Sequence, residues 1–298
     1  MQRVDIKIGF QCNNRCKFCV QGSKRDCLPA KSKKQVEKSL KQAYNKGKRE
    51  VVFTGGEPTL HPNFLDFVKF AKSTGFKEIQ IQTNGRLFAY NDFCIKTIKA
   101  GATQFSPAVH GPNVKIHDFL TDAKGSFKQT IQGIKNLKKL DQYVLTNTVI
   151  TSTNAPYLPQ IAKLLVGLGV NQYQFAFIHI SGRAKENKDW IVPKKSKIIN
   201  YIKKGLDIGI KANKRVMTEA IPYCLMKGYE DYIAEKVIPP SVVYDAGFVI
   251  EDYHEYRRNQ GKTKGPNCSK CKYNKICEGP WKEYPEIFGW DEFKPILK

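Results

Sequence analysis

Strand-like and helix-like segments alternate along the first 210 residues of the chain. This alternation implies parallel strands joined by helical crossovers, because parallel neighbours cannot be connected by a tight turn. Such units either close as a barrel or open as a doubly wound sheet, and both gather ligands at the carboxyl ends of the strands. The expected strands are 4–10, 50–56, 78–85, 102–111, 142–150 and 170–180, and the expected helices are 33–45, 61–75, 92–101, 125–140, 155–169 and one near 196–208.

Polar motifs follow five of these strands. Because the carboxyl ends of parallel strands meet at one edge of a sheet, we expect the motifs to lie around a single site. In chain order they are CNNRCKFC (12–19), TGGEP (54–58), QTNG (82–85), VHG (109–111) and SGRA (181–184).

The first motif places Cys12, Cys16 and Cys19 on one short loop. A structural zinc site normally has four protein ligands, whereas three thiolates leave one iron of a [4Fe–4S] cluster without a protein ligand. The open position is where chemistry takes place. The alternative is a zinc knuckle completed by Cys27 or by a histidine.

The second motif is a glycine turn that carries one carboxylate. Glycines allow backbone groups to approach a ligand closely, and Glu57 is able to accept a hydrogen bond from an ammonium group. An ordinary glycine turn with a surface glutamate is the alternative when the motif is considered alone.

Together, CNNRCKFC and GGEP resemble the motifs of radical SAM enzymes. The resemblance implies a partial (β/α)6 barrel of the TIM type over residues 1–215. It also implies that a [4Fe–4S] cluster binds S-adenosylmethionine (SAM) through its open iron. One electron then cleaves the sulfonium to methionine and a 5′-deoxyadenosyl radical, which abstracts a hydrogen atom from the substrate.

The resemblance also implies roles for particular residues. Cys12, Cys16 and Cys19 would hold the cluster, and Phe18 would lie near the adenine. Further contacts to SAM would come from Gly55, Gly56, Glu57, Pro58, Thr83, Asn84, Asn147 and Arg183. For Arg183, a carboxylate contact and an ordinary surface ion pair both remain open. His110 ends the fourth strand and is a candidate for substrate contact, with a structural histidine as the alternative.

Residues 216–298 lack the strand–helix rhythm and are expected to form a small Cys-rich metal-cluster domain. The motif CSKCKYNKIC brings Cys268, Cys271 and Cys277 together, and Cys224 would complete four thiolates. Zinc and a second [4Fe–4S] cluster both fit such a set. The spacing resembles the auxiliary-cluster domains called SPASM and twitch. Cys27 or the substrate is the alternative fourth ligand.

The chain has 50 Lys and Arg residues against 27 Asp and Glu, a net charge of +23. Such a surface attracts polyanions, but the lysines are spread along the chain, which favours ordinary solvated helix faces. Nine cysteines, no secretion-signal pattern and no long apolar run indicate a cytoplasmic protein outside the membrane.

The leading hypothesis is modification of a peptide or protein, with a reductant such as flavodoxin or ferredoxin. Modification or cyclisation of RNA, a nucleotide or another small molecule is the second hypothesis. A non-catalytic metal-cluster scaffold is the third.

Overall fold

The computed structural model describes residues 3–297, which form one nine-stranded sheet in the order β7-β6-β5-β4-β3-β2-β1-β8-β9. Neighbouring strands pair in parallel from β7 to β8, and only β9 runs antiparallel to its neighbour. The expected parallel α/β architecture is confirmed. The strands are β1 (Arg3–Gly9), β2 (Glu50–Gly55), β3 (Glu78–Thr83), β4 (Gln104–Pro107), β5 (Tyr143–Ile150), β6 (Gln172–Phe177), β7 (Arg215–Glu219), β8 (Ser241–Tyr244) and β9 (Val249–Ile250).

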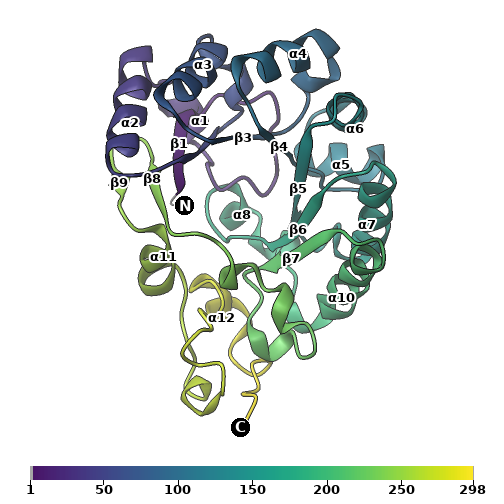
Figure 1. The fold of residues 1–298 in the computed structure, drawn as a ribbon. Coiled ribbons are helices and arrows are strands. Elements are labelled where there is room, and N and C mark those ends of the chain that lie inside the picture. The colour runs from purple at the N-terminus through teal and green to yellow at the C-terminus, as the bar shows by residue number, and fades with distance from the viewer. Residues whose placement is uncertain (1–2, 298) are drawn as a thin grey trace.

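Helices cover the outer face of the curved sheet, which forms an open, partial barrel (Figure 1). Figure 1 also shows the C-terminal segment, drawn in yellow, at one end of the molecule below β7. The helices are α1 (Lys24–Cys27), α2 (Lys33–Asn45), α3 (Phe64–Thr74), α4 (Asn91–Ala100), α5 (Val114–Thr121), α6 (Ser126–Lys139), α7 (Leu158–Gly167), α8 (Arg183–Glu186), α9 (Lys188–Ile191), α10 (Lys195–Lys211), α11 (Tyr253–Tyr256) and α12 (Glu283–Phe288).

Local sequence signals explain where the main helices begin and end. At the start of α2, Ser32 and Gln35 form a reciprocal capping box that satisfies two backbone amides. Helix α3 ends at Gly75, whose φ of 107° is accessible mainly to glycine. The expected helix 155–169 begins as a short 3-10 turn and becomes α-helical at Leu158.

The hydrophobic core lies between the sheet and the surrounding helices. In β6, Tyr173, Phe175 and Phe177 are buried on the outer face, whereas Gln172 and Gln174 face the inside of the barrel. Comparable polar side chains on the other strands line a cavity of about 540 Å³ inside the barrel, which we call the lumen cavity. This barrel is therefore hollow and polar, unlike the packed aliphatic interior of a typical TIM barrel.

The C-terminal region contributes to the same sheet. Strand β8 pairs in parallel with β1, with Arg3 opposite Ser241 and Ile6 opposite Tyr244. The expected boundary at 215/216 falls inside β7, and division into two domains remains a prediction. Residues 1, 2 and 298 lie outside the described residues. Within residues 3–297, we find no helix with the length and apolar character that a membrane span requires.

Candidate active site

The carboxyl ends of the strands surround a cavity of about 500 Å³, which we call the rim cavity. The loop after β1 supplies all three N-terminal cysteines to its wall. Loops after β2, β3 and β4 supply further predicted residues, so motifs separated by up to about 90 positions share one site. Nine predicted residues line the cavity: Cys12, Cys16, Phe18, Cys19, Gly55, Gly56, Thr83, Asn84 and His110.

Backbone hydrogen bonds hold the cysteine loop (residues 12–19) against α5. The amides of Arg15 and Lys17 donate to carbonyl oxygens in the last turn of α5, each at 2.9 Å. Within the loop, the amide of Asn14 donates to Sγ of Cys12 at 3.4 Å. An amide directed at a sulfur stabilises its thiolate, which is the state that binds metal.

The thiols of this loop are electrostatically suited to a cationic cofactor. Burial raises the pKa of Cys12 to about 11, although the hydrogen bond from Asn14 acts in the opposite direction. Burial and the neighbouring thiolates of Cys19 and Cys12 raise the pKa of Cys16. Three thiolates in one partly buried wall therefore require a positive partner to be deprotonated together, and an iron–sulfur cluster supplies that charge.

The glycine turn after β2 packs directly on the end of β1. The amide of Gly56 donates to Gly9 at 2.9 Å, and the amide of Glu57 donates to Gln11 at 2.8 Å. A Cβ added at Gly56 would overlap the carbonyl oxygens of Phe10 and Gln11. In addition to the close approach of a ligand that the motif predicts, this contact between two backbone segments requires glycine at position 56.

Glu57 joins the turn after β2 to the turn after β3. Its buried carboxylate accepts hydrogen bonds from Oγ1 of Thr59 at 2.6 Å, from Oγ1 of Thr83 at 2.7 Å and from the amide of Asn84 at 2.6 Å. Neither Glu57 nor Pro58 lines the rim cavity. The structure therefore places Glu57 where it orients Thr83 and Asn84, while a direct contact from its carboxylate to SAM remains a prediction.

His110 lies in the wall of the rim cavity and packs edge-on against Phe18, with ring centroids 4.7 Å apart. Its Nδ1 accepts a hydrogen bond from the amide of Val149 at 3.3 Å. Burial, assisted by the neighbouring His117, holds the pKa of His110 well below its usual value. The imidazole is therefore neutral at physiological pH. Its hydrogen bond to the backbone is compatible with a structural role, and its place in the cavity wall is compatible with substrate contact.

Besides Glu57 and Pro58, two more predicted residues are absent from the lining of the rim cavity. Asn147 lines the lumen cavity, and its buried Oδ1 has no hydrogen-bond partner. Arg183 donates to the carbonyl of Arg15 and lies 3.8 Å from the carboxylate of Asp122. In this structure Arg183 therefore supports the cysteine loop in addition to forming a surface ion pair.

The four C-terminal cysteines also come together. They line a separate, small cavity that we call the C-terminal cysteine cavity, and Cys27 is exposed and lines neither cysteine-containing cavity. Burial raises the pKa of Cys224 to about 12, reinforced by the other three thiolates. The C-terminal cysteine cavity is lined by the four predicted ligands Cys224, Cys268, Cys271 and Cys277.

Over residues 3–297, no group of three or more His, Cys, Asp or Glu side chains is placed to hold a single metal ion.

Comparison with known proteins identifies the family. A model of the radical SAM superfamily matches residues 6–165, which is more than half of the chain. The chain belongs to the radical SAM superfamily. Radical SAM enzymes use a [4Fe–4S] cluster and S-adenosylmethionine, and these are the cofactors of this chain.

Curated relatives in this family have different substrates in their names. The AdoMet-dependent heme synthase of Oleidesulfovibrio alaskensis is 27% identical over 59% of this chain, and the match spans only 45% of that protein. The heme synthase of Methanosarcina barkeri is 23% identical over 90% of this chain and 87% of its own length. A probable GTP 3′,8-cyclase of Saccharolobus islandicus is 28% identical over 62% of this chain and 59% of its own length.

Solved radical SAM structures share the fold over almost the whole chain. Streptococcus suis SuiB bound to its precursor peptide SuiA superposes with a TM-score of 0.70 and 17% identity, covering 93% of this chain and 71% of SuiB. Native anSMEcpe with bound AdoMet superposes with a TM-score of 0.68 and 16% identity, covering 98% of this chain and 96% of that protein. These similarities establish the fold.

Four further residues that the sequence motifs do not indicate also line the rim cavity. Lys7 on β1 and Asp245 after β8 form an ion pair in the wall of the rim cavity. His179, after β6, stacks on Trp281 with ring centroids 4.0 Å apart and an interplanar angle of 11°. Strand alternation could have placed Lys7 on the inner face. Asp245 and Trp281 carry no local signal, because long-range packing brings them to the cavity.

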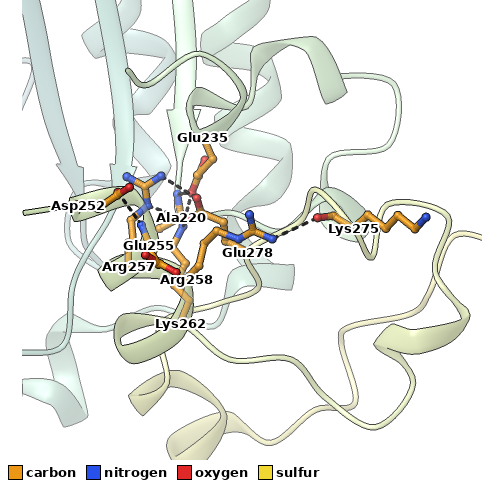
Figure 2. A network of polar contacts seen from close by, with 9 residues as sticks. All are labelled: Ala220, Glu235, Asp252, Glu255, Arg257, Arg258, Lys262, Lys275 and Glu278. Atoms are coloured by element: carbon orange, nitrogen blue, oxygen red, sulfur yellow. Dashed lines mark hydrogen bonds and ion pairs between the residues drawn. The ribbon is translucent and has the colours of Figure 1, made fainter. Parts of the chain in front are cut away.

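A buried network of ion pairs attaches residues 268–278, which we call the C-terminal cysteine region, to the edge of the barrel (Figure 2). Glu278, next to a predicted ligand, accepts two hydrogen bonds from Arg257 at 2.6 and 2.7 Å and one from Lys262 at 2.8 Å. Lys262 also pairs with Glu235, which accepts a hydrogen bond from the amide of Ala220 just after β7 at 2.7 Å. These contacts fix the position of the C-terminal cysteine region relative to the rim cavity.

Proposed function

We propose that the chain is a radical SAM enzyme that modifies a peptide or protein, with its cluster held by Cys12, Cys16 and Cys19. The observation that carries the proposal is that these three thiols share one cavity with the glycine turn, Thr83 and Asn84. The cluster, when bound, supplies the electron that cleaves SAM and starts hydrogen abstraction from a substrate.

The chain's own residues divide the work around that cofactor. We assign contacts to the methionine part of SAM to Gly55 and Gly56, whose turn is fixed on β1. Thr83 and Asn84 are held in place by Glu57 and are assigned to the polar groups of the nucleoside. Phe18, which packs on His110, is assigned to the adenine side of the cavity.

A second [4Fe–4S] cluster is proposed for the C-terminal cysteine cavity. The support is the convergence of Cys224, Cys268, Cys271 and Cys277, a complete set of four ligands. A cluster near the end of the barrel can accept an electron from a substrate radical. Spectroscopy and metal analysis of the purified protein separate this proposal from zinc.

The peptide or protein substrate is supported by two fold neighbours that match nearly the entire chain. SuiB was solved with a precursor peptide, and anSMEcpe was solved with peptides. Both matches extend through the C-terminal region, which supplies Asp245, Tyr253 and Trp281 to the rim cavity. A small acidic electron carrier such as flavodoxin or ferredoxin is the proposed reductant, since the chain carries a charge of +23.

A nucleotide, RNA or another anionic small molecule is the second candidate substrate. The names of the curated relatives, a GTP cyclase and heme synthases, favour it, as does the net charge of +23. Binding of RNA should weaken steeply as salt rises, because phosphate contacts release counterions. Binding that is indifferent to salt would count against an RNA substrate.

The first experiment tests the cofactor assignment. Protein reconstituted anaerobically with iron and sulfide is incubated with SAM and dithionite, and 5′-deoxyadenosine is measured. We expect formation by the wild type and none by Cys16→Ala. Cys271→Ala should still cleave SAM without substrate and lose the iron expected for the second cluster. Absence of 5′-deoxyadenosine from iron-replete wild type would refute the proposal.

The second experiment identifies the substrate class by isotope transfer. Perdeuterated peptide and nucleotide fractions are prepared separately and incubated with the reconstituted enzyme and unlabelled SAM. The peptide proposal predicts deuterium in 5′-deoxyadenosine, or in SAM if it is regenerated, only with the peptide fraction. Deuterium acquired only from the nucleotide fraction would replace the first candidate by the second.

A further inference from the structure

Three arginines from three separate segments donate hydrogen bonds to the cysteine loop. We infer that Arg25, Arg86 and Arg183, which we call the arginine clamp, hold residues 12–16 in place and favour the reduced state of the cluster. This inference rests on the proposed function, because it takes the cysteine loop as the site of the cluster.

Two arginines of the clamp donate hydrogen bonds to residues 12–14 of the cysteine loop. Arg25, in α1, donates to the carbonyl of Asn14 at 2.6 Å and to the carbonyl of Cys12 at 2.8 Å. Arg86, after β3, donates to the carbonyl of Asn13 and to the side-chain oxygen of Asn14, the latter at 3.0 Å. A planar guanidinium with five N–H groups is able to hold two acceptors at once in fixed directions.

The third arginine of the clamp contacts residues 15 and 16 of the cysteine loop. Arg183, at the start of α8, donates to the carbonyl of Arg15 and lies within 3.5 Å of the carbonyl of Cys16. The clamp therefore satisfies consecutive loop carbonyls from three directions. Since the amides of Arg15 and Lys17 donate to α5, the loop is fixed on both sides.

The positive charge of the clamp is only weakly neutralised by neighbouring carboxylates. Arg25 lies 3.6 Å from Asp26, whose side chain is 65% exposed, and Arg183 lies 3.8 Å from the half-exposed Asp122. Among the ion pairs of residues 3–297, none includes Arg86. Water strongly screens the attraction between each arginine and its exposed carboxylate. The carboxylates therefore cancel little of the positive charge that the arginines place beside the loop.

The charge of the cofactor gives the direction of the effect. A cubane with two positive charges and three thiolates carries one net negative charge, and one-electron reduction makes it two. A nearby fixed cation stabilises the more negative state more strongly, so the clamp raises the reduction potential. The guanidinium groups also lie close to the ligands themselves, because Arg25 donates to the carbonyl of Cys12 at 2.8 Å and Arg183 lies within 3.5 Å of the carbonyl of Cys16.

The test is a redox titration of reconstituted protein followed by electron paramagnetic resonance. The N-terminal cluster is recognised as the one whose signal changes when SAM is added. We expect each of Arg25→Gln and Arg86→Gln to reduce the ratio of reduced to oxidised cluster about tenfold at a fixed potential, a fall of about 59 mV in the midpoint. The corresponding lysine variants keep the charge and should recover most of the shift.

Arg49→Gln is the matched control. Arg49 also donates to two backbone carbonyls, those of Tyr44 at 2.9 Å and Lys48 at 2.8 Å, but it precedes β2 at the opposite end of the barrel. Its midpoint and iron content should match the wild type. If a clamp variant with glutamine loses its iron while the lysine variant retains it, the holding role is supported.

Clamp variants that keep wild-type iron content and wild-type midpoint would overturn the inference. The same holds if lysine and glutamine variants at one position shift the midpoint equally, because the charge would then have no effect. If the wild type itself has no SAM-responsive cluster, the proposed function fails instead. The two failures are therefore distinguishable in the same titration.

Discussion

Replacing Gly56 by alanine tests the packing of the glycine turn on the end of β1. The new Cβ would lie 2.5 Å from the carbonyl carbon of Phe10 and closer still to two carbonyl oxygens. Overpacking of this kind costs about 1–3 kcal/mol. Displacing the turn also weakens the backbone bonds of Gly56 and Glu57, at about 1 kcal/mol each. We therefore expect a loss of about 3–5 kcal/mol in the free energy of unfolding.

The assay is urea unfolding under anaerobic conditions, followed by circular dichroism, with iron content measured in parallel. Gly167→Ala is the control, because a Cβ there meets no heavy atom within 4 Å. In α7 this change should leave stability unchanged or raise it by up to about 1 kcal/mol. Equal unfolding midpoints for the two variants would refute the packing argument.

Three further predictions concern charge and metal binding. Glu278→Gln leaves Arg257 and Lys262 without their shared carboxylate and should cost about 3–5 kcal/mol in urea unfolding at pH 7. Burial acts to raise the pKa of Glu278, but the hydrogen bonds and charges of Arg257 and Lys262 together lower it from its usual value, so this difference should persist to pH 5 and shrink only in stronger acid; an earlier decline would contradict it. Burial lowers the pKa of His110, so the stability of the wild type should fall below about pH 6.5, where the unfolded state gains a proton, and His110→Gln should fall less. Cys27→Ala should leave iron content unchanged, whereas lost iron would revive Cys27 as a ligand.

Local patterns predicted most of the barrel. Helix 33–45 and the six strands could be identified because periodicity and breaker residues act within a few positions. Strands β7, β8 and β9 were not predicted because they are short and depend on pairing with other strands: β7 pairs with β6, β8 with the distant β1, and β9 with β8. Helix α5 was missed because it has only eight residues between two loops.

The candidate site was predictable where spacing alone defines it. The cysteine loop, Gly55 and Gly56 stand at strand ends, and the geometry of parallel strands brings them together. Asn147 lines the lumen cavity and not the rim cavity, because the position of a residue along the inner face depends on strand register; its contact with SAM stays a prediction. The sequence carries no signal for Arg25 and Arg86, because their partners are backbone carbonyls whose positions depend on the folded loop.

The pairing of β8 with β1 affects the order in which the molecule is assembled. During synthesis, β1 and the cysteine loop emerge before β8, so the neighbour of β1 on one side is complete only after Tyr244 has been made. Until then, the part of the rim-cavity wall that carries Asp245 and Trp281 is absent. If the cluster is loaded before β8 pairs with β1, this late pairing step also closes the cofactor site.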